Sequence, residues 1–230
     1  MPLRTHDAAR LSRRRNHPFR NGRVLWLLAL LVAPVSGCFA ANRGPFGIDY
    51  LVTYDDSGIW NRKYQQALEY GVLAFAVGGA LWEGGETRFG RTLWQSVDAA
   101  VASGVVAQAM KYTFSRVRPI DSGPGGDPNL WFKGHGNQSF PSGEVTLVSS
   151  VVTPIVLEYG PQHPAVYALE LLPIYDAIAR VKVQAHWQSD VIAGFALGTG
   201  AAWLIHGSPN SPFILKVMPH GIYVGIGKHF

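Results

Sequence analysis

The chain is organised around the stretch Ala179-Arg-Val-Lys-Val-Gln-Ala-His-Trp-Gln-Ser-Asp190, which lies just before an apolar run. His186 and Asp190 are four residues apart, so on a helix their side chains share one face. Asp190 can then accept the imidazole N–H, fix the tautomer of His186 and leave the other ring nitrogen free to act as a nucleophile. Together with Arg180, these groups are suited to phosphate chemistry, although a His-x-x-x-Asp pair alone is more often structural.

Two earlier segments carry groups that bind anions. Lys111 and Arg118 lie near the end of a predicted helix, two turns apart on one face, and Pro119 ends that helix because the residue before a proline is pushed out of the helical region. Ser142 and Gly143 open another predicted helix, where free N–H groups and the helix dipole attract anions. Each segment alone also fits a surface charge or an ordinary N-cap.

The three segments together resemble the signature of the type 2 phosphatidic acid phosphatase superfamily, which includes bacterial acid phosphatases, lipid phosphatases and vanadium haloperoxidases. The matching patterns are Lys-x₆-Arg-Pro at 111–119, Pro-Ser-Gly at 141–143 and Arg-x₅-His-x₃-Asp at 180–190. Their order and internal spacing agree with the family. The resemblance implies a compact all-α helical bundle of the acid phosphatase type, which acts on phosphate esters without a metal ion or other cofactor.

The resemblance also implies a role for each matching residue. The groups that would hold the phosphoryl oxygens are Lys111, Arg118, Arg180, Ser142 and the Gly143 amide. His186 would attack phosphorus to form a phosphohistidine, Asp190 would orient the imidazole, and water would then release phosphate. Three fixed cations would neutralise the charge that develops during transfer.

Two positions depart from the family pattern. Ala179 stands where the family usually has Ser, which removes one hydrogen bond to phosphate. Glu144 stands where the family has the His that protonates the leaving oxygen, so Glu144 is the candidate general acid. A carboxyl serves that role only with a raised pKa: burial raises it, whereas nearby cations and a helix N-terminus lower it. The alternative is that Glu144 is an acidic first-turn residue without a catalytic role.

Three functions therefore remain open from the sequence. The first is a phosphatase acting on a phosphomonoester or a pyrophosphate, either soluble or lipid-linked. The second is an anion- or lipid-phosphate-binding protein that lost turnover through Glu144. The third, a vanadium haloperoxidase, is disfavoured because its chemistry also depends on the missing His.

The hydrophobic pattern predicts five helices and a short C-terminal β-hairpin. The helices are expected at about 61–82, 91–117, 143–158, 164–178 and 187–206, and the strands at Phe213–Met218 and Gly221–Ile226. The loop 120–140 is too long for a plain connector, and loops of that length are commonly either functional or disordered. We assign residues 1–37 to an export signal, 38–60 to an irregular arm, 61–208 to the helical domain and 209–230 to the β appendage.

The charge distribution supports the export signal. Residues 1–37 hold seven of the 20 basic residues and one of the 15 acidic residues, so the remainder carries 13 basic and 14 acidic residues. An Arg-rich start, the apolar run 24–32 and the sequence Val-Ser-Gly-Cys at 35–38 resemble a lipoprotein signal, in which Cys38 becomes the lipidated first residue. Ordinary cleavage near Ala40 or Ala41 is the alternative.

The expected partners follow from this processing. Cys38 is the only cysteine, so the chain has no intrachain disulfide. A mature chain with almost no net charge is not expected to bind nucleic acid. None of its apolar runs reaches the ~20 residues that span a bilayer, so we expect an envelope protein tethered by lipid. An integral membrane enzyme with short helices is the alternative, and homodimerisation is left open.

Overall fold

The computed structural model describes residues 44–206, 213–218 and 221–226. The export signal, Cys38 and parts of the two terminal segments lie outside these residues. The α-helices of the described chain are α2 (Arg62–Glu83), α3 (Arg88–Phe114), α4 (Gly143–Tyr159), α5 (Leu171–Lys182) and α6 (Gln188–His206). Short 3₁₀ helices are η1 (Pro45–Gly47), η2 (Gly58–Trp60), η3 (Pro119–Asp121) and η4 (Pro164–Glu170).

The C-terminal segment forms the expected hairpin of β1 (Phe213–Met218) and β2 (Gly221–Ile226). The strands are antiparallel, with Phe213 opposite Ile226 and Met218 opposite Gly221. The predicted all-α bundle with a short β-hairpin is therefore confirmed.

Local sequence explains where the first two long helices begin and end. The Asn61 side chain accepts the Lys63 N–H at 3.0 Å and caps α2, and Thr87 caps α3 by accepting the Gly90 N–H at 2.9 Å. Gly84 ends α2 with a positive φ of 69°. Ser115 ends α3 in the left-handed region, with φ 40°.

The end of α3 corrects one prediction. Helix α3 ends at Phe114, so Arg118 is not on the helix that carries Lys111. Arg118 is extended, with φ −72° and ψ 154°, because Pro119 follows it. The two cations therefore approach the same region from a helix and from a loop, and not from one helical face.

The helix boundaries around the third motif also differ from the prediction. The segment expected as one helix at 164–178 divides into η4 and α5, and α5 continues far enough to include Arg180. Helix α6 begins at Gln188, so His186 precedes it. The shared helical face expected for His186 and Asp190 is wrong for this reason.

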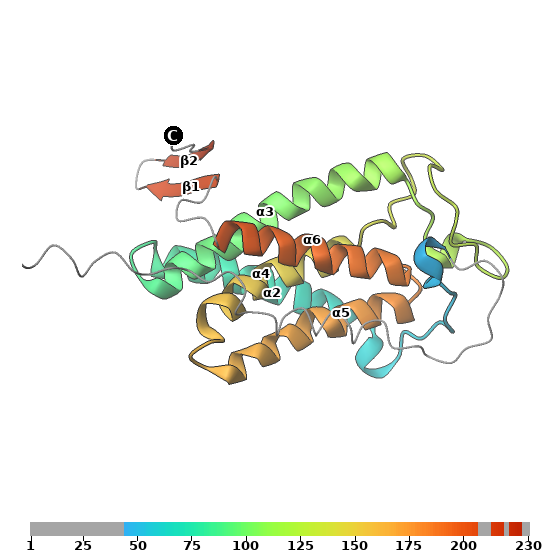
Figure 1. Ribbon diagram of the computed structural model, residues 1–230, viewed down its shortest axis with the longest axis horizontal. Coiled ribbons are helices and arrows are strands. Elements are labelled where there is room, and N and C mark those ends of the chain that lie inside the picture. The colour runs from blue at the N-terminus through green and yellow to red at the C-terminus, as the bar shows by residue number, and fades with distance from the viewer. Residues whose placement is uncertain (1–43, 207–212, 219–220, 227–230) are drawn as a thin grey trace, which may run out of the picture. The chain divides into compact units, whose positions relative to one another are not determined.

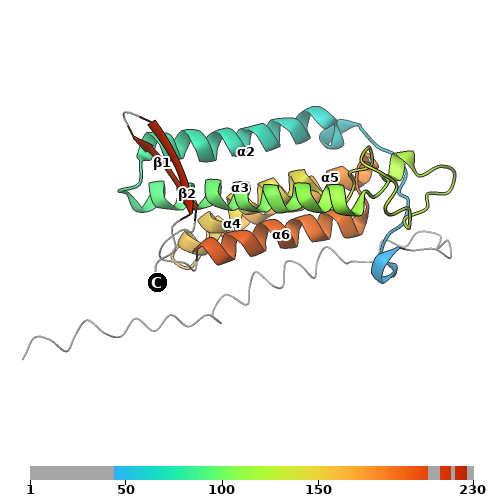
Figure 2. The ribbon, with the colours of Figure 1, turned by 90° about the horizontal axis from the view of Figure 1, so that it is seen from above.

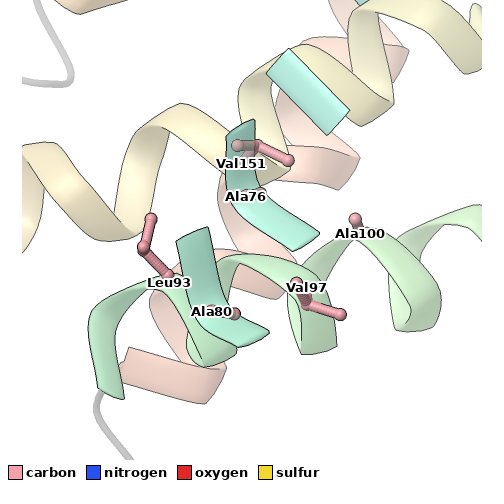
Figure 3. Packing of buried hydrophobic residues seen from close by; sticks show 6 residues of the cluster. All are labelled: Ala76, Ala80, Leu93, Val97, Ala100 and Val151. Carbon is pink, nitrogen blue, oxygen red and sulfur yellow. The ribbon is translucent and has the colours of Figure 1, made fainter. Parts of the chain in front are cut away.

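Helix α4 is the centre of the bundle, where it packs against α6, α3 and α5, while α2 packs on α3 (Figure 1). One buried cluster joins three of these helices, as Figure 3 shows. Its members are Ala76 and Ala80 of α2, Leu93, Val97 and Ala100 of α3, and Val151 of α4. Replacing Leu93 by Ala would cost about 2–5 kcal/mol, the usual loss for a buried leucine.

Glycines let α6 approach α4 closely. A Cβ on Gly194 would stand 2.5 Å from the carbonyl oxygen of Ser142, and a Cβ on Gly198 would stand 2.1 Å from the Ser149 hydroxyl. Both distances are shorter than real Cβ atoms allow. This approach brings the start of α4 against the start of α6, where the Ser142 N–H donates to the Asp190 carbonyl at 3.0 Å.

The segments that carry the three motifs meet at one end of the bundle. The loop after α3 and the arm before α2 lie at this end in both views (Figures 1 and 2). The arm is tied to the end of α5 by the Asp55 N–H, which donates to the Lys182 carbonyl at 3.0 Å. Among the described residues, none of the helices combines the length and the apolar character that crossing a membrane requires.

Candidate active site

His186 lies between α5 and α6 with 2% of its surface exposed. Its Nδ1 is 2.7 Å from the carbonyl oxygen of Ser139. A carbonyl only accepts, so Nδ1 carries the proton and Nε2 keeps its lone pair. Burial, together with Arg180, Lys111 and Arg118, lowers the pKa of His186 well below its usual 6.5. The imidazole is therefore neutral at physiological pH, with a free Nε2.

Asp190 reaches His186 in a different way from the one predicted. Its Oδ2 is 3.8 Å from His186 Nδ1, too far for a hydrogen bond. Instead, Oδ2 accepts the Ser139 hydroxyl at 2.5 Å and the Trp187 N–H at 2.9 Å. Burial raises the pKa of Asp190 above its usual 3.8, while Arg116 and these two donors oppose that rise. Asp190 thus fixes Ser139, and the Ser139 carbonyl fixes His186.

Arg116 is a buried residue of this site that sequence reasoning missed. Its side chain has no exposed surface and forms ion pairs with Asp190 at 2.5 Å and with Asp49 of the arm at 2.6 Å. The guanidinium also donates to the Pro128 carbonyl at 2.7 Å and stacks 4.2 Å from the Trp131 ring centroid. Since Asp49 lies 67 residues away in the chain, no local pattern distinguishes Arg116 from an exposed arginine.

Asp49 completes this network. Its carboxylate accepts the Ser189 N–H and the Ser189 hydroxyl, both at 2.7 Å. The irregular arm is therefore bound to the first turn of α6, beside Asp190.

The three predicted cations surround His186 from different elements. Lys111 of α3 donates to the Gln138 carbonyl at 2.8 Å, and burial lowers its pKa from 10.5 to about 8, with a further contribution from Arg118. Arg118 donates to the carbonyl of Ala185, the residue before His186, at 3.4 Å. Arg180 of α5 donates to Gln65 of α2 at 3.0 Å. The structure brings all three cations together around His186.

Ser142 and Gly143 lie beside Lys111 at the start of α4. A Cβ on Gly143 would be 3.4 Å from Lys111 Cε and 4.0 Å from Nζ, so the ammonium lies against the helix N-terminus. The Ser142 hydroxyl is buried and has no hydrogen-bond partner among the described residues. A buried hydroxyl without a partner is costly, and beside a helix N-terminus and three cations it is well placed to donate to an anion.

Glu144 is paired with two arginines. Its Oε1 is 2.5 Å from Arg62 Nη2, and its Oε2 is 2.6 Å from Arg180 Nε and 3.9 Å from His186 Nε2. Burial favours a higher pKa, but the opposing charges prevail and lower the pKa of Glu144 below its usual 4.5. Arg180 opposes the effect of burial most strongly, followed by His186 and Arg62. The raised pKa that a general acid requires is therefore not found.

The described residues contain no group of three or more His, Cys, Asp or Glu side chains arranged to hold a metal ion. Sequence reasoning missed several residues of the site, among them Arg62, Asp49, Arg116 and Ser139.

Comparison with known proteins identifies the family. The model of the PAP2 superfamily matches residues 92–211, just over half of the chain, and this range includes all three motifs. The chain belongs to the PAP2 superfamily.

The chain is also similar to a lipid A 1-phosphatase of Porphyromonas gingivalis, with 28% identity over 119 residues. The matched region is 51% of this chain and 24% of that relative, so the similarity spans about a quarter of the relative's length. No solved structure matches the chain.

Proposed function

We propose that this PAP2 protein is a phosphatase that hydrolyses a phosphomonoester or a diphosphate through a phosphohistidine on His186. The observation that carries the proposal is the neutral imidazole, whose Nδ1–H is held by the Ser139 carbonyl at 2.7 Å and whose Nε2 is free. Membership of the family and the similarity to a lipid A 1-phosphatase support phosphate ester hydrolysis.

The first half of the reaction transfers the phosphoryl group. Lys111, Arg118 and Arg180 hold the phosphoryl oxygens, and the Ser142 hydroxyl donates a further hydrogen bond. The Nε2 lone pair of His186 then attacks phosphorus, and the bond between phosphorus and the leaving oxygen breaks with its electron pair on that oxygen. The cations stabilise the charge of this transition state without a metal ion.

The second half releases phosphate. Water attacks the phosphorus of the phosphohistidine, and the P–N bond breaks so that Nε2 regains its lone pair. The proton that the water loses passes to solvent or leaves with the phosphate. Asp190 and Ser139 are positioning residues in both halves, because they fix the imidazole and do not touch the substrate.

A lipid phosphate is the substrate class that we favour. An apolar groove of about 590 Å³ runs between α3 and α6. These two helices also carry Lys111 and Asp190, at the ends where the site lies. The larger side chains of the groove are Val101, Val105, Val106, Leu197, Leu204 and Ile205. An acyl chain bound there would contact α3, the helix that also carries the phosphate-binding Lys111.

Chain-length dependence tests the lipid substrate. Alkyl phosphates of increasing length should inhibit competitively with a Ki that falls about fourfold per methylene, the equivalent of ~0.8 kcal/mol per buried CH₂, until the groove is full. Val105→Asp should abolish this trend and leave the Ki of a short phosphate unchanged. A Ki independent of chain length would exclude the groove as the acyl site.

A second candidate function is phosphate or lipid-phosphate binding without turnover. The ion-paired Glu144 favours it, because no protonated carboxyl at this position can assist the leaving group. Turnover of an ester separates this function from the first.

Phosphate release from 4-nitrophenyl phosphate by the purified protein tests the proposed function. His186→Ala should abolish release, whereas His206→Ala, which removes the imidazole that contacts Gln95 elsewhere in the bundle, should not. Orthovanadate should inhibit competitively, and EDTA should have no effect. Undiminished release by His186→Ala would refute the nucleophile, and no release by the wild type would favour the binding function.

We also propose that the protein is exported to the cell envelope and anchored through lipid on Cys38. The Arg-rich start, the apolar run and Val-Ser-Gly-Cys at 35–38 support this proposal. Mass spectrometry of the mature N-terminus should find a lipidated Cys38, and Cys38→Ser should block processing or release the protein. An unmodified N-terminus beyond Cys38 would contradict the anchor.

A further inference from the structure

The surroundings of Glu144 differ from those that a proton donor needs. Its carboxylate lies between Arg62 of α2 and Arg180 of α5, at 2.5 and 2.6 Å. The Arg62 contact is a charge-assisted hydrogen bond, whereas the Arg180 contact is an ion pair without hydrogen-bond geometry. The side chain of Glu144 is 17% exposed and that of Arg62 is 37% exposed, so the pair lies at the rim of the site. The carboxylate is thus held ionised next to the reacting nitrogen of His186.

Other carboxyls in the same region hold protons more readily than Glu144 does. Asp176 of α5 is buried, and burial raises its pKa to about 7, with a further contribution from Glu144. Burial and Glu144 also raise the pKa of Glu69 of α2. Protons taken up by this cluster therefore go to Asp176 and Glu69 before Glu144.

An ionised Glu144 has a consequence for the choice of substrate. Resting on the proposed function, we propose that the protein is specific for leaving groups that depart without a proton. Among phosphate substrates, lipid-linked ones included, it should therefore prefer a diphosphate to a phosphomonoester. A phosphate leaving group has a pKa of about 6, whereas an alkoxide is comparable to hydroxide, for which water has a pKa of about 15.7. Only the former leaves readily as an anion.

Arg62 fits this choice because it adds a fourth cation to the site. It is more exposed than Arg180, and it contacts the Glu144 oxygen that is not next to His186. When His186 Nε2 attacks the terminal phosphorus of a diphosphate, the bridging P–O bond breaks and its electron pair stays on the departing phosphate. Arg62 is placed to bind that anion, which a neutral alcohol would not require.

A leaving-group series tests the proposal with the full chain. The measurement is kcat/KM for inorganic diphosphate, 4-nitrophenyl phosphate, phenyl phosphate and a short alkyl phosphate. The alkyl phosphate should be slower than the diphosphate by roughly 10²- to 10⁴-fold, the usual worth of general acid catalysis. Phenyl phosphate should fall between them, because a phenol has a pKa of about 10.

Two variants should change the ratio of kcat/KM for the diphosphate to kcat/KM for the alkyl phosphate, and one variant should not. Glu144→His should raise alkyl phosphate turnover and flatten the dependence on the leaving group. Arg62→Gln should lower this ratio for two reasons. It removes one of the two arginines that keep Glu144 ionised, and it removes the cation that would bind the departing phosphate. Arg88→Gln is the matched control, since it breaks the Arg88–Glu158 ion pair outside the site, and it should leave the ratio unchanged.

The outcomes separate this proposal from the proposed function. Equal kcat/KM for the alkyl phosphate and the diphosphate, with turnover lost in His186→Ala, would overturn the leaving-group specificity and leave the phosphatase intact. A steep dependence that Glu144→His does not flatten would also overturn it. No turnover of any substrate would refute the proposed function and this proposal together.

Discussion

Replacing Arg116 by Met should destabilise the protein strongly, although Arg116 belongs to no part of the predicted site. The substitution keeps an unbranched side chain between Trp131 and Trp187 but removes the cation that pairs with both Asp49 and Asp190. Asp49 and Asp190, both buried, then lose this counter-charge. Removing one partner of a buried ion pair costs about 3–5 kcal/mol, and for a chain of this length each kcal/mol lowers Tm by roughly 2–4 °C.

Thermal unfolding of the wild type and the variants measures this cost. We expect Arg116→Met to lower Tm by about 6–20 °C. The decrease should be larger at ~pH 8 than at ~pH 5, because the unpaired buried carboxyls are ionised at the higher pH. Adding Asp49→Asn should recover part of the loss. The control Arg88→Met removes a partly exposed ion pair, which solvent screens, and should lower Tm far less than Arg116→Met does. A decrease in Tm for Arg116→Met that is no larger than the decrease for Arg88→Met would refute the argument.

Three further predictions concern groups around the site. Burial lowers the pKa of Lys111 to about 8, so kcat/KM should fall as the pH rises through that value. Lys111→Arg should move this decrease to higher pH. A kcat/KM that does not change with pH in this range would contradict a role for the charge of Lys111. Burial raises the pKa of Glu170 from 4.5 to about 7, so its contribution to stability is complete below pH 4.5 and is lost as the pH rises through 7. The free energy of unfolding of Glu170→Gln, measured in urea, should therefore rise relative to that of the wild type as the pH increases, by up to about 3 kcal/mol. A difference in unfolding free energy that does not change with pH would rule this out. Gly194→Ala should lower both Tm and activity, because its Cβ would stand 2.5 Å from the Ser142 carbonyl oxygen. Gly200→Ala should lower neither, because a Cβ there meets nothing within 4 Å. Equal effects of the two substitutions would show that the close approach of α6 to α4 is unimportant.

Local features of the sequence predict most of the fold. Apolar periodicity, the caps Asn61 and Thr87 and the break at Gly84 act over a few residues, so the helices and both strands lie close to their expected positions. The exceptions also have local causes. Ser115 adopts a left-handed conformation that ends α3 early, and α6 begins only at Gln188.

The site was predictable as a set of residues but not as a set of contacts. The three motifs identify the cations and His186, and the structure brings them together. The partners that decide their chemistry are distant in the chain: Arg62 lies 82 residues from Glu144, and Asp49 lies 67 residues from Arg116. Sequence alone could not decide the protonation of Glu144, because the opposing effects of burial and of these arginines depend on distances that only the fold determines.

Trapping of the covalent intermediate tests the central claim most directly. The protein would be mixed with a ³²P-labelled phosphate ester or diphosphate, quenched within one turnover by alkali and digested for mass spectrometry. The account predicts acid-labile, alkali-stable label on His186 alone, at Nε2, and none in His186→Ala. Phosphate release without any protein-bound label, or label on another residue, would contradict it.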